Sequence, residues 1–138
     1  MNVLIVDDEP LARDRLQRMI ASLPDFNVVA MAENGQQAIQ RASELNPDVV
    51  LMDVRMPGMD GIAAAQHLAE LDPPPAVIFC TAYEDYAIEA FSSQAIGYLL
   101  KPVKQTDLDA ALSRTGRVNK AQLNNLHDSV GIGEGGRT

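Results

Sequence analysis

Cysteine is almost missing from this sequence: Cys80 is the only one among 138 residues, so no disulfide can form within the chain. Histidine is nearly as scarce. His67 and His127 have no second histidine or cysteine at the spacing of zinc ligands, so neither indicates a zinc site. Cys80 follows the apolar residues 77–79, and we interpret it as a small buried hydrophobic side chain.

Long apolar runs and basic residues are also lacking. No apolar run reaches the roughly 20 residues of a membrane-spanning helix. The N-terminal sequence MNVLIVDDEP lacks the basic start of a signal peptide, so we expect a cytoplasmic location and no membrane partner. Eleven Lys and Arg against 19 Asp and Glu give a net charge of −8. This charge opposes binding to DNA phosphates, so DNA contact is expected only through an additional domain.

Short apolar runs alternate with helical patterns over residues 1–115. The runs have strand length and do not alternate with polar residues, which predicts strands covered on both faces: 3–6, 28–32, 49–52, 76–80 and 98–100. Apolar stripes at helical spacing predict helices between and after them, around 10–23, 38–45, 62–71, 84–92 and 105–115. Pro10 suits a first helical turn, and Asp60 and Thr106 suit N-cap positions. The pattern predicts an α/β, flavodoxin-like (βα)5 doubly wound parallel sheet with strand order 2-1-3-4-5.

The helical pattern fades after residue 115. The closing residues GIGEGGRT have the composition of a linker. We therefore expect one domain over residues 1–115 and a linker or flexible tail over 116–138, with an output domain absent from this chain.

Acidic residues follow two of the predicted strands. Asp7 and Asp8 follow the first strand and Asp53 follows the third, and these strands are neighbours in the predicted order. At ~4 Å and an effective dielectric constant of ~20, each pair of carboxylates repels by about 4 kcal/mol. Oxygen ligands of this kind suit Mg²⁺, which would relieve that repulsion. The sequence therefore predicts a magnesium site at this edge of the sheet.

Two further polar residues follow the fourth and fifth strands of the predicted sheet. Thr81 offers a hydroxyl after the fourth strand, and Lys101 offers an ammonium group after the fifth. A carboxylate nucleophile, Mg²⁺, a hydroxyl and an ammonium group are the components of phosphoryl transfer to an aspartate. Either residue alone could be an ordinary surface or strand-end side chain, so the prediction rests on their joint placement.

Four segments together resemble one family over residues 1–115: LIVDDEP, VVLMDVRMPGMDG, FCTAYEDYAIEAF and AIGYLLKPV. The sequence is identified as a member of the response-regulator receiver domains, and the last two segments resemble the LytTR class. The resemblance implies that Asp53 is the phosphoacceptor and that Thr81 and Lys101 assist it. It also implies Mg²⁺ ligands at Asp7, Asp8 and Asp53 and at the backbone carbonyl of Arg55.

The resemblance also implies how such a domain signals. A sensor histidine kinase would phosphorylate Asp53, Thr81 and Tyr98 would act as the switch pair, and the bond before Pro102 would be cis. The domain would form a homodimer on activation and control a C-terminal, DNA-binding output module. It would not be an enzyme beyond self-catalysed phosphoryl transfer and autodephosphorylation.

Two finer hypotheses accompany the resemblance. Large side chains at Arg55 and Tyr83 would obstruct the water that hydrolyses the acyl phosphate, which would lengthen its lifetime. The moving face would comprise residues 84–92, the Tyr98 strand and residues 105–115. Ile88, Phe91 and Leu112 are candidates for a dimer surface, with an ordinary core role as the alternative.

Three other functions remain open from the sequence. A phosphatase of the haloacid dehalogenase type also uses aspartate, Mg²⁺, threonine and lysine, although its nucleophile would follow the first strand. A flavodoxin would need a phosphate loop after the first strand, where this chain has acids. A stand-alone receiver would act through protein contacts without a DNA-binding module.

Overall fold

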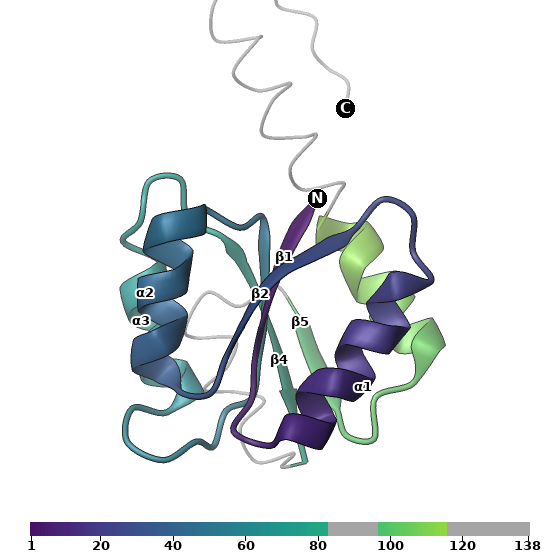
Figure 1. The fold of residues 1–138 in the computed structure, drawn as a ribbon, viewed down its shortest axis with the longest axis horizontal. Coiled ribbons are helices and arrows are strands. Elements are labelled where there is room, and N and C mark those ends of the chain that lie inside the picture. Colours follow the sequence, from purple (N-terminus) through teal and green to yellow (C-terminus); the bar gives the residue numbers. More distant parts are fainter. Residues whose placement is uncertain (83–96, 116–138) are drawn as a thin grey trace, which may run out of the picture.

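The computed structural model describes residues 1–82 and 97–115, which form an α/β fold around one parallel sheet (Figure 1). The strand order is β2-β1-β3-β4-β5, and every pairing is parallel. The predicted flavodoxin-like order 2-1-3-4-5 is therefore confirmed. The strands are β1 Asn2–Val6, β2 Asn27–Ala32, β3 Val49–Met52, β4 Ala76–Thr81 and β5 Gly97–Leu100.

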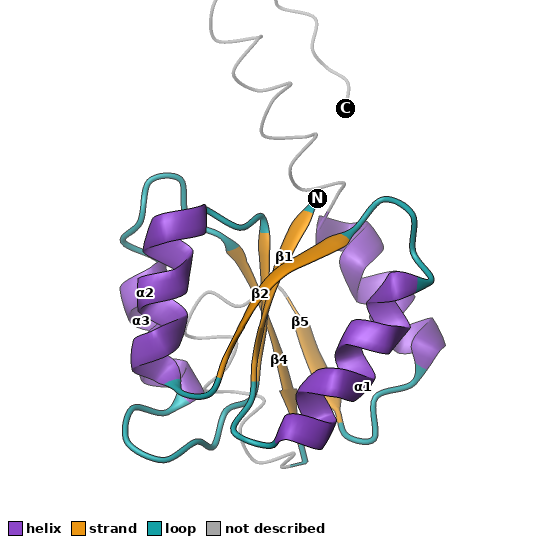
Figure 2. Ribbon diagram, in the orientation of Figure 1, coloured by secondary structure: helices purple, strands orange, loops and turns teal. Residues whose placement is uncertain are grey.

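Helices cover both faces of the sheet (Figure 2). On one side lie α1, Pro10–Ala21, and the helix at 105–115. On the other side lie α2, Gly35–Leu45, and α3, Gly61–Leu68. The strands are buried between these two layers, which explains why their apolar runs show no polar alternation.

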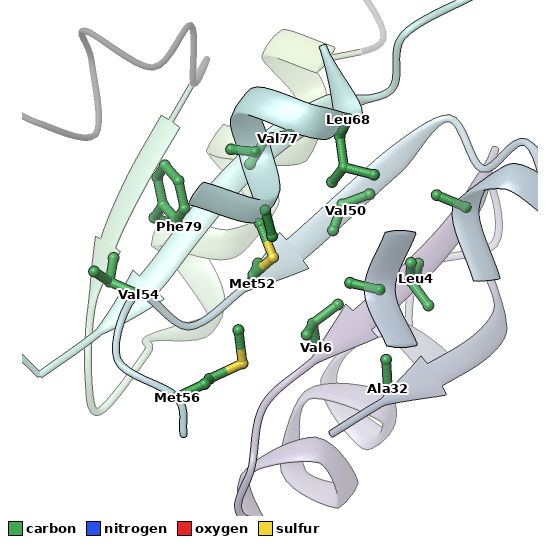
Figure 3. Packing of buried hydrophobic residues seen from close by; sticks show 14 residues of the cluster. Leu4, Val6, Ala32, Val50, Met52, Val54, Met56, Leu68, Val77 and Phe79 are labelled. Carbon is green, nitrogen blue, oxygen red and sulfur yellow. The ribbon is translucent and has the colours of Figure 1, made fainter. Parts of the chain in front are cut away.

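Successive residues of the central strands point into two different hydrophobic clusters. Val3 and Ile5 of β1 pack with α1 and the 105–115 helix, whereas Leu4 and Val6 pack with α2 and α3. Figure 3 shows the second cluster. The helices contribute mainly small side chains to it, Ala38, Ala42, Ala64 and Ala65. The fully buried sheet side chains that it contains include Leu4, Val6, Val50, Met52 and Phe79.

Two of the three predicted helix-start residues, Pro10 and Asp60, lie where the sequence predicts them. Pro10 lies in the first turn of α1, and the Asp60 carboxylate accepts a hydrogen bond from the Ala63 amide at 2.8 Å, capping α3. The prediction of Thr106 as an N-cap is wrong. The helix already includes Gln105, and the Leu108 amide donates to the Lys104 carbonyl at 3.0 Å, so the first turn begins earlier.

Of the two roles considered for Leu112, the core role is confirmed and the dimer surface is excluded, because its side chain is fully buried in the cluster beneath α1. Tyr83, Ile88, Phe91 and the predicted helix at 84–92 lie outside the described residues, as does the predicted linker at 116–138. Within the described part of the chain, no helix is both long and apolar enough to cross a membrane.

Candidate functional site

The acidic residues predicted from the sequence meet at the carboxyl ends of β1 and β3. Parallel pairing sets Val6 opposite Met52, so the two residues that follow, Asp7 and Asp53, emerge side by side. The Asp53 amide donates to the Val6 carbonyl at 3.0 Å, which extends the strand pairing to the site itself. One carboxylate oxygen each from Asp7, Asp8 and Asp53 lies within 4.8 Å of the others.

Burial differs among the three carboxylates. Asp7 is 1% exposed and Asp53 is 7% exposed, whereas Asp8 faces solvent. Backbone amides hold the two buried groups: Glu9 donates to Asp7 Oδ1 at 2.9 Å and Arg55 donates to Asp53 Oδ1 at 3.3 Å. The cluster thus has two fixed carboxylates inside and one at its entrance.

Lys101 brings a positive charge to the same point from β5. Its Nζ lies 2.7 Å from Asp7 Oδ2 and 3.1 Å from Asp53 Oδ2, which makes it a bridge between two buried carboxylates. The Lys101 amide donates to the Thr81 carbonyl at 2.9 Å, so the end of β4 fixes the lysine backbone. The Lys101–Pro102 peptide bond is cis, as expected.

The buried charges shift the acid–base behaviour of the site. Burial raises the pKa of Asp53; the charge and hydrogen bond of Lys101 oppose this, Asp7 adds to it, and the net pKa stays above the ordinary 3.8. Burial alone would lower the pKa of Lys101. The hydrogen bond to Asp7 and the charge of Asp53 outweigh that, so the lysine pKa lies above 10.5. At neutral pH Lys101 is therefore positively charged.

The raised pKa of Asp53 predicts how an Asp53→Asn variant behaves without metal. In the folded state Asp53 binds a proton at a higher pH than in the unfolded chain, so its contribution to stability falls as pH rises through the folded pKa. The variant should therefore be more stable than the wild type at pH 7, where the wild-type carboxylate is ionised and buried. Urea unfolding in EDTA should show this gap shrinking toward pH 3; a constant gap would contradict the assigned pKa direction.

The donor set fits a hard divalent cation. The three carboxylates and the Lys101 ammonium carry a formal charge of −3 + 1 = −2. All the clustered ligand atoms are oxygens, which suits Mg²⁺ better than zinc. The solvent-facing Asp8 leaves the cluster accessible to a hydrated ion.

Comparison with known proteins decides the family. The family described as "Response regulator receiver domain" matches residues 3–113. The chain belongs to the response-regulator receiver domains. This family is regulatory, so the receiver is not a classical enzyme, and the haloacid dehalogenase and flavodoxin alternatives are set aside.

Individual relatives agree with this assignment. The receiver is 52% identical over 124 residues to the "Positive alginate biosynthesis regulatory protein" of Pseudomonas aeruginosa, a match that covers 89% of this chain and 50% of the relative. It is 30% identical over 131 residues to the "Sensory transduction protein LytT" of Bacillus cereus, covering 95% of this chain and 53% of the relative, which supports the LytTR resemblance. Other relatives are named transcriptional regulatory proteins. The chain spans about half the length of these relatives.

A solved structure shows the same fold. The response regulatory domain of mrkE from Klebsiella pneumoniae superposes with a TM-score of 0.79 at 28% identity, covering 86% of this chain and 97% of that one.

The predicted switch residues lie on β4 and β5, the two strands beyond β3 in the sheet. Thr81 is the last residue of β4 and is fully buried. Tyr98 of β5 is half-buried, pairs in register with Phe79, and packs against the cluster beneath α2 and α3. Their roles in switching, and that of the Arg55 carbonyl as a metal ligand, remain predictions.

Gly61 is a site residue that sequence reasoning missed. A Cβ atom at this position would lie 2.2 Å from the Asp53 carbonyl oxygen, so α3 can begin against the receiver's acidic loop only with glycine there. The Gly61 amide also donates to the Val54 carbonyl at 2.7 Å. The signal was present in the segment MPGMDG, but spacing alone does not reveal such a close backbone contact.

Cys80 is predicted to be chemically inert in the folded receiver. Burial raises the pKa of its thiol from 9.0 to about 12, and the side chain is 1% exposed. At pH 8 the reactive thiolate should therefore be about a thousandfold scarcer than for an ordinary cysteine. Labelling with a disulfide reagent should be fast only in denaturant, whereas fast labelling of the native protein would contradict this burial.

Proposed function

We propose that this receiver accepts a phosphoryl group on Asp53 from a sensor histidine kinase, with Mg²⁺ bound by Asp7, Asp8 and Asp53. The observation that supports this most is the convergence of three carboxylates within 4.8 Å, with Lys101 in contact with Asp53 Oδ2. Bound Mg²⁺ would neutralise the carboxylates and the phosphoryl oxygens, and the Arg55 carbonyl would complete its protein ligands.

The chemistry assigned to the chain's own residues is simple. An Asp53 carboxylate oxygen attacks phosphorus, and the bond from phosphorus to the donor breaks, with its electron pair leaving on the donor atom. Ionised Lys101 stays near the incoming group and stabilises the negative charge on its oxygens. The Thr81 hydroxyl donates a hydrogen bond to another phosphoryl oxygen. The resulting rearrangement of Thr81 changes the position of Tyr98.

The output of the switch follows from the same proposal. Rearrangement at Thr81 and Tyr98 would promote a homodimer and control a C-terminal, DNA-binding module in the cytoplasm. The names of the relatives and the half-length match support such a module. The acyl phosphate would be removed by self-catalysed hydrolysis, slowed by the side chains of Arg55 and Tyr83. A stand-alone receiver is the alternative, and the sequence of the full-length gene product distinguishes the two.

Phosphorylation by a small donor tests the proposal. The protein is incubated with acetyl phosphate, with Mg²⁺ or with EDTA, and its intact mass is measured. We expect one added phosphoryl group in Mg²⁺ and none in EDTA. Asp53→Asn should gain none in either condition, while the matched variant Asp60→Asn, at the exposed N-cap of α3, should still react. An equal gain by Asp53→Asn would exclude Asp53 as the acceptor.

A further inference from the structure

A side-chain bond joins α1 to the segment that follows β5. The Arg15 guanidinium Nη2 donates to the Val103 carbonyl at 2.7 Å, across 88 residues of sequence. Figure 1 shows that α1 lies on the same face of the sheet as the helix at 105–115, so this bond spans the junction between them. Arg15 is exposed, whereas the residue that it holds, Val103, is 2% exposed and packs in the cluster beneath α1.

The position of this bond matters because Val103 lies two residues after Lys101. On one side, the Lys101 amide is held by the Thr81 carbonyl at 2.9 Å. On the other side, two residues further along the chain, the Val103 carbonyl accepts the hydrogen bond from Arg15. The lysine ammonium then extends to Asp7, which precedes α1, the helix that carries Arg15. These contacts form a closed ring. It runs from Asp7 along α1 to Arg15, across to Val103 in the segment after β5, and through Lys101 back to Asp7.

A second arginine of α1 strengthens this reading. Arg13 Nη1 donates to the backbone carbonyl of Asp7 at 2.6 Å, so α1 holds the acid at one end of the ring and the loop after Lys101 at the other. Arg18, on the same helix, forms an ion pair only one turn away with exposed Asp14 and is 72% exposed, so it makes no such link in its described contacts. The hydrogen bonds of Arg13 and Arg15 thus end on the backbone carbonyls of Asp7 and Val103, whereas Arg18 contacts only a side chain of its own helix in its described contacts.

We propose that Arg15 is a positioning residue for Lys101: through the Val103 carbonyl it fixes the backbone from which the lysine reaches Asp53. A charged donor on a backbone carbonyl is stronger than a neutral hydrogen bond, which suits a contact made at the surface. The inference rests on the proposed phosphorylation of Asp53. Arg15 does not touch the reacting atoms, so its effect passes entirely through Lys101.

A double-mutant cycle tests this path. Phosphorylation by acetyl phosphate at saturating Mg²⁺ is timed for the wild type, Arg15→Met, Lys101→Met and the double variant. A small donor is used so that no contact with a partner protein affects the rate. We expect Arg15→Met to slow the wild type about five- to tenfold, the size of one charge-assisted hydrogen bond. In the Lys101→Met background the same change should have almost no effect, because the residue that Arg15 positions is gone.

The controls separate positioning from general stability. Arg18→Met removes the same charge from the same helix and should react at the wild-type rate, and Arg15→Lys, which keeps a donor, should recover part of the lost rate. An equal slowing by Arg15→Met in both backgrounds, or none in the wild type, would overturn the inference while leaving the proposed function intact. A wild type that takes up no phosphoryl group would overturn both.

Discussion

Replacing Lys101 with methionine is expected to lower the free energy of unfolding by about 2–3 kcal/mol at pH 7 in EDTA. The ammonium bridges Asp7 and Asp53, which are 1% and 7% exposed, and methionine leaves two buried carboxylates without that charge. Lys101 is itself partly exposed, with 21% of its side chain accessible, so the loss should stay below that of a fully buried pair.

The pH dependence of this loss has a definite sign. Lys101 now lowers the pKa of Asp53, so its removal raises that pKa further and makes the ionised carboxylate more costly to bury. The destabilisation should therefore be largest at neutral pH and shrink as the carboxylates take up protons in acid. Because the folded pKa of Lys101 is raised, its stabilising effect should also fade in the wild type as pH rises above 10.5.

Urea unfolding with and without Mg²⁺ measures the effect. Saturating Mg²⁺, at about 100 times its dissociation constant, should add about 2.7 kcal/mol to a receiver that binds it only when folded. It should therefore restore much of the stability of Lys101→Met. The control is Lys104→Met, which removes an exposed charge close by in sequence and should change stability by less than about 0.5 kcal/mol. Equal losses for the two variants would contradict the bridging role.

Gly61→Ala is expected to destabilise the receiver by about 3 kcal/mol and to slow phosphorylation of Asp53 as well. The new methyl group would lie 2.2 Å from the Asp53 carbonyl oxygen, and that atom belongs to backbone, which cannot swing aside as a side chain would. Either α3 or the loop after β3 must move. Both the stability and the position of the acceptor carboxylate should therefore suffer.

Gly58 provides the matched control for this prediction. It lies in the loop before α3, three residues ahead of Gly61, and has a φ of +76°, but a Cβ atom there would meet nothing within 4 Å. Gly58→Ala should cost only the strain of that backbone conformation, about 1 kcal/mol. Thermal unfolding and acetyl phosphate kinetics on both variants measure the difference. If Gly58→Ala proved as damaging as Gly61→Ala, the close contact with Asp53 would not be the cause.

The fold was predictable because each apolar run fits one kind of element, a strand buried on both faces of the sheet. Residues 3–6 and 49–52 are apolar throughout, and only a strand between two helical layers buries every side chain of such a run. The predicted strand order already makes the strands before Asp7 and Asp53 neighbours, which places the two acids side by side. Burial to 1% at Asp7 and the bridging geometry of Lys101 depend on distances that a sequence does not contain.

The wrong predictions and the missed residues all depend on contacts between segments that the residue types alone do not reveal. Thr106 has the right chemistry for an N-cap, but the helix begins at least one residue earlier, where Gln105 donates to the Met19 carbonyl at 3.2 Å and ties the helix start to α1. Leu112 fits both a core stripe and a surface, and only its packing beneath α1 decides between them. Gly61 and Arg15 act through backbone carbonyls, which every residue possesses, so residue identity gives little indication of their contacts.

Locating the phosphoryl group tests the central claim most directly. After reaction with acetyl phosphate and Mg²⁺, borohydride reduces an aspartyl phosphate to homoserine, and peptide mass spectrometry then identifies the converted residue. We predict homoserine at position 53 alone, with Asp7 and Asp8 unchanged and no conversion in EDTA. Conversion at Asp7 or Asp8, or conversion at Asp53 that needs no divalent cation, would contradict the account.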